Sequence, residues 1–161
     1  MKLIIFGLII LLFGALGYQV KLKYKKQKET LQELKKFLEF LHLNISIYKN
    51  NIDEIIKMYL IQQNNKIAKL VNNFLKNNKL RVFDTKNTEL NLYNENAKLA
   101  IKTYFDNLGK GDLKSECDNC KSLLSQLEIW IKETEVDLKI KGDLLFKIML
   151  AIGVVVVIIL W

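Results

Sequence analysis

The chain has 161 residues, a formal net charge of +8 and no proline. One domain accounts for this length, and the absence of proline, which interrupts helix interiors, predicts helix almost throughout. The basic residues are lysines apart from Arg81, whereas proteins that read bases and phosphates favour the planar arginine fork. We therefore expect an all-α protein that does not bind nucleic acid.

The N-terminal stretch Leu3–Val20 carries no charge over 18 residues, enough to cross a hydrocarbon layer of about 30 Å. A basic cluster follows it, formed by Lys21, Lys23, Lys25, Lys26 and Lys28. Lysines beside an apolar segment are held on the cytoplasmic side, so we predict an uncleaved anchor over residues 1–20. The alternative is a secretory signal cut near Ala15-Leu16-Gly17, which intact mass would reveal.

The C-terminal run Ile148–Trp161 has 14 residues and becomes a plausible span by recruiting Leu144–Phe146, with Lys147 reaching the interface. We predict a second transmembrane segment over 144–161 and a cytoplasmic helical bundle over 21–143. Glycines at 7, 14 and 17 fall close to one helical face, which permits close contact with another membrane helix. Membrane helices also tolerate glycine without such contact.

Two long apolar stripes alternate steps of three and four residues, the coiled-coil spacing of a helix–helix seam. The first comprises Leu31, Leu34, Leu38, Leu41, Ile45, Tyr48, Ile52 and Ile55, widened by Phe37, Phe40, Leu43 and Ile47. The second comprises Leu113, Cys117, Cys120, Leu124, Leu127, Ile131, Thr134 and Leu138. The widened first stripe predicts a compact bundle rather than a two-helix rod.

Shorter elements separate the two seams. Asn51 is a predicted cap for a helix from Ile52 to about Gln62, and apolar residues between Ile67 and Leu75 recur at helical spacing. Residues 76–93 show no period and predict a loop. A further short helix carries apolar residues from Leu99 to Leu108.

Residues 108–120, LGKGDLKSECDNC, contain two glycines and a Cys-x-x-Cys. The glycines lack the spacing of a Walker loop or a dinucleotide fingerprint. We expect Gly109 to close one helix in the left-handed conformation and Asp112 to cap the next. Leu108, Gly109 and Asp112 then form a structural motif that sets the angle between two bundle helices.

Cys117, Cys120 and His42 are the soft metal ligands of the chain, one fewer than a structural zinc site needs, although a site shared between two protomers stays open. Both cysteines lie on the second seam, where free cysteine behaves as a small buried hydrophobe. His42 is expected in solvent or at the edge of the core. No constellation of acids and bases converges, so we expect no metal, no cofactor, no small-molecule substrate and no enzymatic activity.

Two stretches, LEFLHLNISIYKNNIDEI (Leu38–Ile55) and FDNLGKGDLKSECDNCKSLL (Phe105–Leu124), together with the apolar ends, resemble the stage III sporulation protein AB family. The matching positions are Leu38, Leu41, Ile45, Ile52 and Glu54 in the first motif and Tyr104, Leu108, Gly109 and Asp112 in the second. The chain departs from the family pattern at Asn44 for glutamate, Ile47 for tyrosine and Asn51 for proline, and has Ser115-Glu116-Cys117 in place of a glutamine-rich helix start.

The resemblance implies a non-enzymatic platform similar to the cytoplasmic F domain of type II secretion and type IV pilus systems. It implies a place in the channel between mother cell and forespore, in the mother-cell membrane facing the forespore. The implied partners are the secretion-type ATPase of the same operon and the other stage III sporulation AC to AH proteins. The rival hypotheses are a membrane-anchored helical adaptor or envelope protein unrelated to sporulation and, less favoured, an enzyme that uses the Cys-x-x-Cys.

Overall fold

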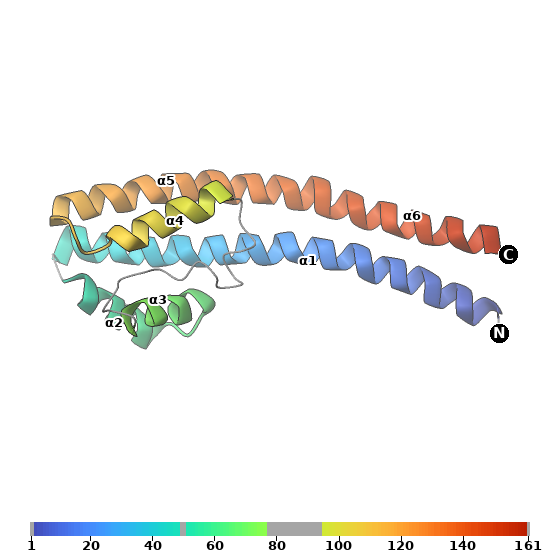
Figure 1. Ribbon diagram of the computed structural model, residues 1–161, viewed down its shortest axis with the longest axis horizontal. Coiled ribbons are helices and arrows are strands. Elements are labelled where there is room, and N and C mark those ends of the chain that lie inside the picture. The colour runs from blue at the N-terminus through green and yellow to red at the C-terminus, as the bar shows by residue number, and fades with distance from the viewer. Residues whose placement is uncertain (1, 49–50, 77–94, 161) are drawn as a thin grey trace. The chain divides into compact units, whose positions relative to one another are not determined.

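The computed structural model describes residues 2–48, 51–76 and 95–160, and all regular structure in these ranges is helical. The helices are labelled in Figure 1. They are α1 (Lys2–Leu43), a π-helical turn η1 (Asn44–Tyr48), α2 (Ile52–Gln62), α3 (Lys66–Lys76), α4 (Glu95–Asn107), α5 (Leu113–Asp137), a second π-helical turn η3 (Leu138–Gly142) and α6 (Asp143–Leu160). The expected all-α class is confirmed.

The chain divides into two compact units. Unit 1 joins Met1–Lys28 to Lys132–Trp161, and unit 2 comprises Glu29–Ile131. The long helices α1 and α5 contribute to both units. The sequence predicts different boundaries, after residue 20 and before residue 144, because they mark where the chain would enter a bilayer. These membrane boundaries stay a prediction.

Unit 1 is an antiparallel pair of helices in close contact through glycine. A Cβ atom on Gly17 would lie 2.9 Å from the Cα of Phe146, and one on Gly153 would lie 3.2 Å from the Cβ of Phe13. Gly14 faces Leu150 in the same way, whereas Gly7 has nothing within 4 Å. The expected glycine contact therefore involves Gly14 and Gly17 but not Gly7.

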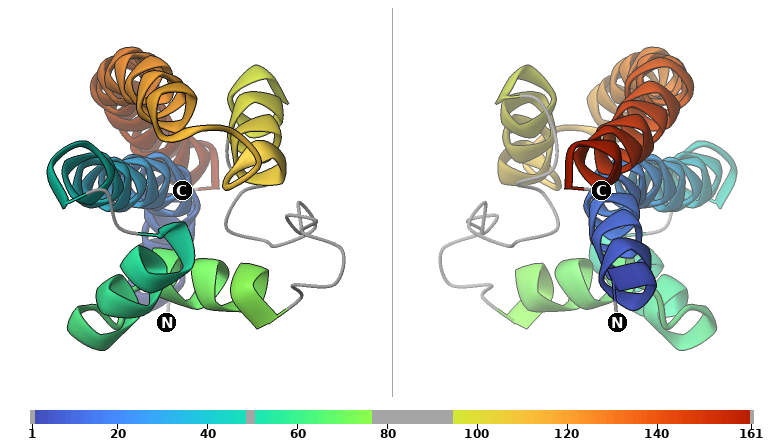
Figure 2. Two further views of the ribbon diagram at one scale, coloured as in Figure 1. Left: turned by 90° about the vertical axis from the view of Figure 1, so that its left-hand side faces the viewer. Right: turned by 90° about the vertical axis from the view of Figure 1, so that its right-hand side faces the viewer.

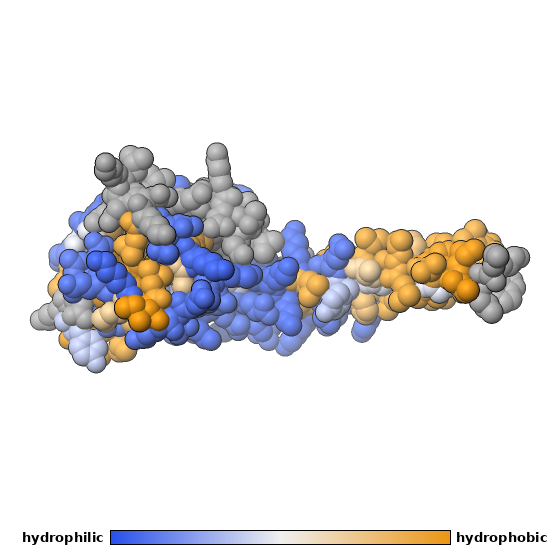
Figure 3. Space-filling model, turned by 90° about the horizontal axis from the view of Figure 1, so that it is seen from below, coloured by the Kyte–Doolittle hydropathy of each residue, from blue (hydrophilic) through white to orange (hydrophobic). Residues whose placement is uncertain are grey.

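The two apolar helices of unit 1 are long enough and apolar enough to cross a membrane. The 18 residues of α6 span about 27 Å at 1.5 Å per residue, close to the hydrocarbon thickness. Figure 1 shows both termini at the same end of this unit, and Figure 3 shows that this end is apolar. Large apolar side chains such as Leu11 and Ile159 are more than two-thirds exposed there, as expected for lipid-facing positions.

Unit 2 is a bundle with a continuous apolar core. Residues 29–43 of α1 lie between α5 and the α2–α3 pair, with α4 beside α5 (Figures 1 and 2). Phe37 is fully buried, and its ring contacts Tyr59 edge-on at a centroid distance of 4.9 Å and stacks with Phe105 at 6.1 Å. One aromatic ring of α1 thus joins α2 and α4.

Asparagine side chains cap the N-terminal ends of α2 and α3. Asn51 accepts a hydrogen bond from the backbone N–H of Asp53 at 3.1 Å, which confirms the predicted start of α2. Asn65 accepts from the N–H of Ala68 at 2.8 Å and donates to the Tyr59 hydroxyl at 3.2 Å. These bonds satisfy amides that a helix start leaves without partners.

The first apolar stripe is interrupted, because three of its residues are exposed although Ile45, between two of them, and Ile55, after them, are buried. Leu43, Ile47 and Tyr48 are 50%, 62% and 63% exposed, although each belongs to the predicted stripe or its widening. Ile47 and Tyr48 lie in the second half of η1, where the wider π-helical turn rotates side chains away from the seam, whereas Leu43 lies just before this turn. The predicted loop at 76–93 falls, beyond Lys76, outside the described residues.

Candidate functional site

The joint between α4 and α5 has the expected backbone. Gly109 has a φ of 80°, in the left-handed region that disfavours residues with a Cβ. Leu108 is buried at 2% exposure, and the Oδ1 atom of Asp112 accepts a hydrogen bond from the N–H of Ser115 at 3.1 Å. The structure therefore places Leu108, Gly109 and Asp112 together in one tight turn between two helices.

A fourth residue, Glu116, completes the joint and was missed from sequence. Its Oε1 atom accepts hydrogen bonds from the N–H groups of Gly109 at 2.8 Å and Gly111 at 3.1 Å. The Glu116 side chain is only 3% exposed, which makes it one of the few buried charged residues in the described part of the chain. A carboxylate that receives two amide bonds holds the turn against the first turns of α5. The sequence carries no capping-box signal for it, because that motif has its acidic residue three positions after the cap, where this chain has Ser115.

Two asparagines of the first motif, Asn51 and Asn44, each have a clear local role. Asn51 caps α2 through its side chain. Asn44 is 6% exposed and donates a hydrogen bond to the Phe40 carbonyl at 2.8 Å. A neutral amide satisfied by its own helix costs less to bury than a carboxylate.

The structure brings His42 and Cys117 together, although 75 residues separate them. The Nε2 atom of His42 lies 3.2 Å from the Sγ atom of Cys117, and both side chains are half-buried. Cys120, one turn further along α5, is fully buried and donates to the Leu38 carbonyl at 3.3 Å. The predicted buried position is confirmed for Cys120, whereas Cys117 is partly accessible.

Burial governs the titration of the groups around Cys120. Desolvation raises the pKa of the Cys120 thiol to about 11 and also raises the pKa of Tyr104. Among the residues described, three or more His, Cys, Asp or Glu side chains do not come together in a geometry that could hold a metal ion. The expected absence of a metal stays a prediction.

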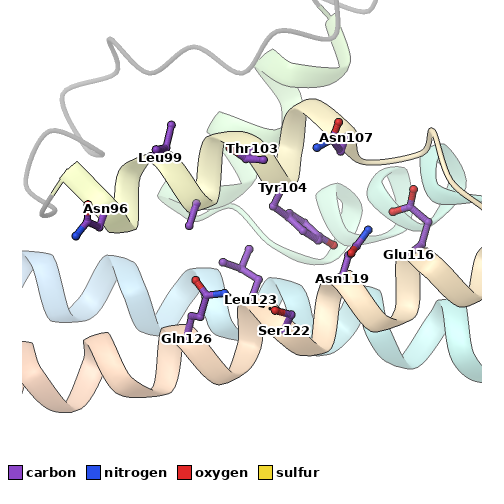
Figure 4. A pocket seen from close by; sticks show the side chains of 11 residues that line it. Asn96, Leu99, Thr103, Tyr104, Asn107, Glu116, Asn119, Ser122, Leu123 and Gln126 are labelled. Atoms are coloured by element: carbon purple, nitrogen blue, oxygen red, sulfur yellow. Dashed lines mark hydrogen bonds between the residues drawn. The ribbon is translucent and has the colours of Figure 1, made fainter.

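A groove of about 440 Å³ lies between α4 and α5 (Figure 4). Its wall combines amides and hydroxyls with the apolar side chains of Leu99, Ala100 and Leu123, and Tyr104 extends from α4 towards α5. The polar lining residues are Asn96, Thr103, Asn107, Asn119, Ser122 and Gln126, together with Glu116. The Oε1 atom of the Glu116 carboxylate is already bonded to the glycine amides, and the other polar groups of the groove are neutral.

The basic cluster after the first apolar segment is partly neutralised by the returning helix. Lys21 forms an ion pair with Asp143 at 2.8 Å, and Lys28 forms one with Glu135 at 3.4 Å. The Lys28 hydrogen bond is the main cause that lowers the pKa of Glu135, and the Lys21 hydrogen bond lowers that of Asp143. Lys23, Lys25 and Lys26 are exposed. The sequence predicts the cluster but not its acidic partners.

Comparison with known protein families gives one identification. The family model for stage III sporulation protein AB matches residues 2–161, nearly the whole chain. Comparisons with curated proteins and with solved structures gave no match. The resemblance seen in the two sequence motifs is thereby confirmed, and the chain belongs to the stage III sporulation protein AB family.

Proposed function

We propose that this protein is a non-enzymatic membrane platform of the channel between mother cell and forespore, required for endospore formation. Membership of the stage III sporulation protein AB family supports a sporulation role, and the two apolar helices indicate membrane association. The observation that carries the proposal is the family match over the whole chain. It disfavours an adaptor unrelated to sporulation.

The proposed location is the mother-cell membrane facing the forespore, with the bundle in the mother-cell cytoplasm. Lysines next to both apolar helices support this orientation, because basic residues are held on the cytoplasmic side. They include the exposed lysines of α1 and, after the second seam, Lys139 and Lys141, which are more than half exposed. The two predicted termini would then cross outward.

The proposed partners are the secretion-type ATPase of the same operon and the other stage III sporulation AC to AH proteins. A platform needs a rigid body beside the membrane, and the continuous core of unit 2 supports that requirement. Exposed apolar and polar surface on unit 2, such as Ile61 at 86% exposure and the α4–α5 groove, supports a role in contact rather than in chemistry.

The experiment is deletion of the gene in its native host, followed by complementation. We expect engulfment to finish and development then to stop, with heat-resistant spores restored by the wild-type gene. Purification of the tagged, detergent-solubilised chain from sporulating cells should recover the operon's ATPase. Normal spore counts in the deletion strain would contradict the proposal, and a developmental block without the ATPase would contradict the partner assignment alone.

A further inference from the structure

The two cysteines of α5 lie one helical turn apart but in different surroundings. Cys120 is fully buried, and its thiol donates to the carbonyl of Leu38. Cys117 is half-buried and contacts the imidazole of His42 at 3.2 Å. Only the second arrangement offers a thiol with both access to solvent and a base within reach of its proton.

Charge around Cys117 favours an anionic reactant. Lys114 and Lys121 lie three residues before and four residues after it, the positions that share its face of α5. Both lysines are exposed. A half-buried thiol in contact with an imidazole, on a helix face that also carries two exposed lysines, is the partly accessible kind of position in which reactive cysteines are found.

The acidic groups near the pair are already engaged or point elsewhere. Glu39, one turn before His42 on α1, lies 3.6 Å from Lys35. Glu116 accepts hydrogen bonds from the two glycine amides of the joint.

The remaining neighbours do not face the Cys117 thiol or are uncharged. Asp118 is exposed and directly follows Cys117, and adjacent residues of a helix do not face each other. On α4, the side that faces these residues carries Tyr104, whose pKa burial raises, so it stays neutral.

We propose that Cys117 is a thiol-modification site, with His42 as its base, for a small anionic disulfide. His42 takes the proton from Sγ of Cys117, and the sulfur attacks one sulfur of the incoming R–S–S–R. The S–S bond of the reactant breaks as the Cys117–S–S–R bond forms, and the departing thiolate takes the proton from His42. The disulfide is the oxidant, and one molecule of R–SH is released for each chain modified.

The product stays a mixed disulfide. Resolution would require Cys120 to attack the new bond as a thiolate, but its thiol is buried, bonded to Leu38 and raised in pKa to about 11. The Cys-x-x-Cys therefore behaves unlike an oxidoreductase pair, in which both cysteines take part. An adduct at Cys117 would lie where α5 packs on α1, at the residue that follows Glu116 of the joint.

The test uses the full chain in detergent, with glutathione disulfide as the probe and intact mass as the readout. We expect one glutathionyl adduct per chain, unchanged in Cys120→Ser and absent in Cys117→Ser. With iodoacetamide at pH 7, we expect Cys117 to react faster than free glutathione. His42→Gln should slow it, because the variant lacks the base that contacts Cys117 and takes the thiol proton.

Circular dichroism of each variant shows that the bundle is folded, and Lys110→Ala is the matched surface control. Three results would overturn the proposal: alkylation of Cys117 no faster than glutathione, a rate unchanged by His42→Gln in a folded protein, or formation of a Cys117–Cys120 disulfide. Stoichiometric zinc in the purified chain would also overturn it, because a metal-bound sulfur would not react in this way. The outcome is independent of the sporulation test.

Discussion

The two units of this protein pack their helices by opposite means. In unit 1, α1 and α6 approach each other closely at glycines, which have no side chain: Gly14, Gly17 and Gly153. Unit 2 fills its interior with large side chains, including Phe37 and Phe105, both fully buried. The difference follows from the solvent each is suited to, because apolar burial stabilises helix contacts in water but gains little in lipid. In lipid, close packing of the two helix backbones stabilises the contact instead of apolar burial.

The largest expected effect is loss of an aromatic ring from the core of unit 2. Phe37→Ala should destabilise the bundle by about 3–5 kcal/mol, because it removes a fully buried ring and leaves a cavity. Chemical denaturation followed by circular dichroism measures the change. Leu11→Ala, at a 70% exposed position of unit 1, is the control and should leave the denaturation midpoint unchanged.

The matching change in unit 1 is the addition of a side chain. Gly17→Leu should force α1 and α6 apart, since a Cβ there would lie 2.9 Å from the backbone of Phe146. Gly7→Leu, with nothing within 4 Å, should be tolerated. Spin labels at Tyr18 and Leu144, in a Cys117→Ser/Cys120→Ser background, should report a longer separation for Gly17→Leu only. An equal change in separation for both substitutions would contradict a close contact between α1 and α6 at Gly17.

Within unit 2, the joint between α4 and α5 should contribute less to stability than the aromatic core. Glu116→Ala should cost about 1–3 kcal/mol, because two glycine amides lose their acceptor. Gly109→Val should cost at least as much, since a β-branched residue is strained at a φ of 80°. Lys110→Ala, exposed in the same turn, should be silent. Thermal unfolding of the three variants makes the comparison, and equal stability for all would contradict it.

The smallest effect concerns the ion pairs of unit 1. Lys21→Ala should raise the pKa of Asp143 towards its ordinary value, since the Lys21 hydrogen bond lowers it. The stabilisation from a carboxylate with a lowered pKa is present above its unfolded pKa and is lost as pH falls through the folded one. The Asp143 pair is solvent-exposed, so we expect a shift in an NMR titration without a measurable change in unfolding. An unshifted Asp143 would show that the pair does not form.

The sequence allows prediction of features that depend on local pattern. The starts of α2 and α5 follow from Asn51 and Asp112, because capping is decided within a few residues. The contact between His42 and Cys117 and the ion pairs of the basic cluster join residues far apart in the chain. Their formation depends on how helices pack, which spacing alone does not determine. The π-helical turn η1 has no local signal of this kind, and it exposes Tyr48.

The most direct test of the central claim is membrane topology, measured with single cysteines in a Cys117→Ser/Cys120→Ser background. One cysteine replaces Leu99, 64% exposed on the bundle, and the other replaces Leu160, 57% exposed at the end of α6. In intact non-sporulating cells that produce the chain in their surface membrane, a membrane-impermeant maleimide should label position 160, and it should label position 99 only after permeabilisation. Labelling of position 99 in intact cells would contradict a platform anchored by both terminal helices with its bundle in the cytoplasm.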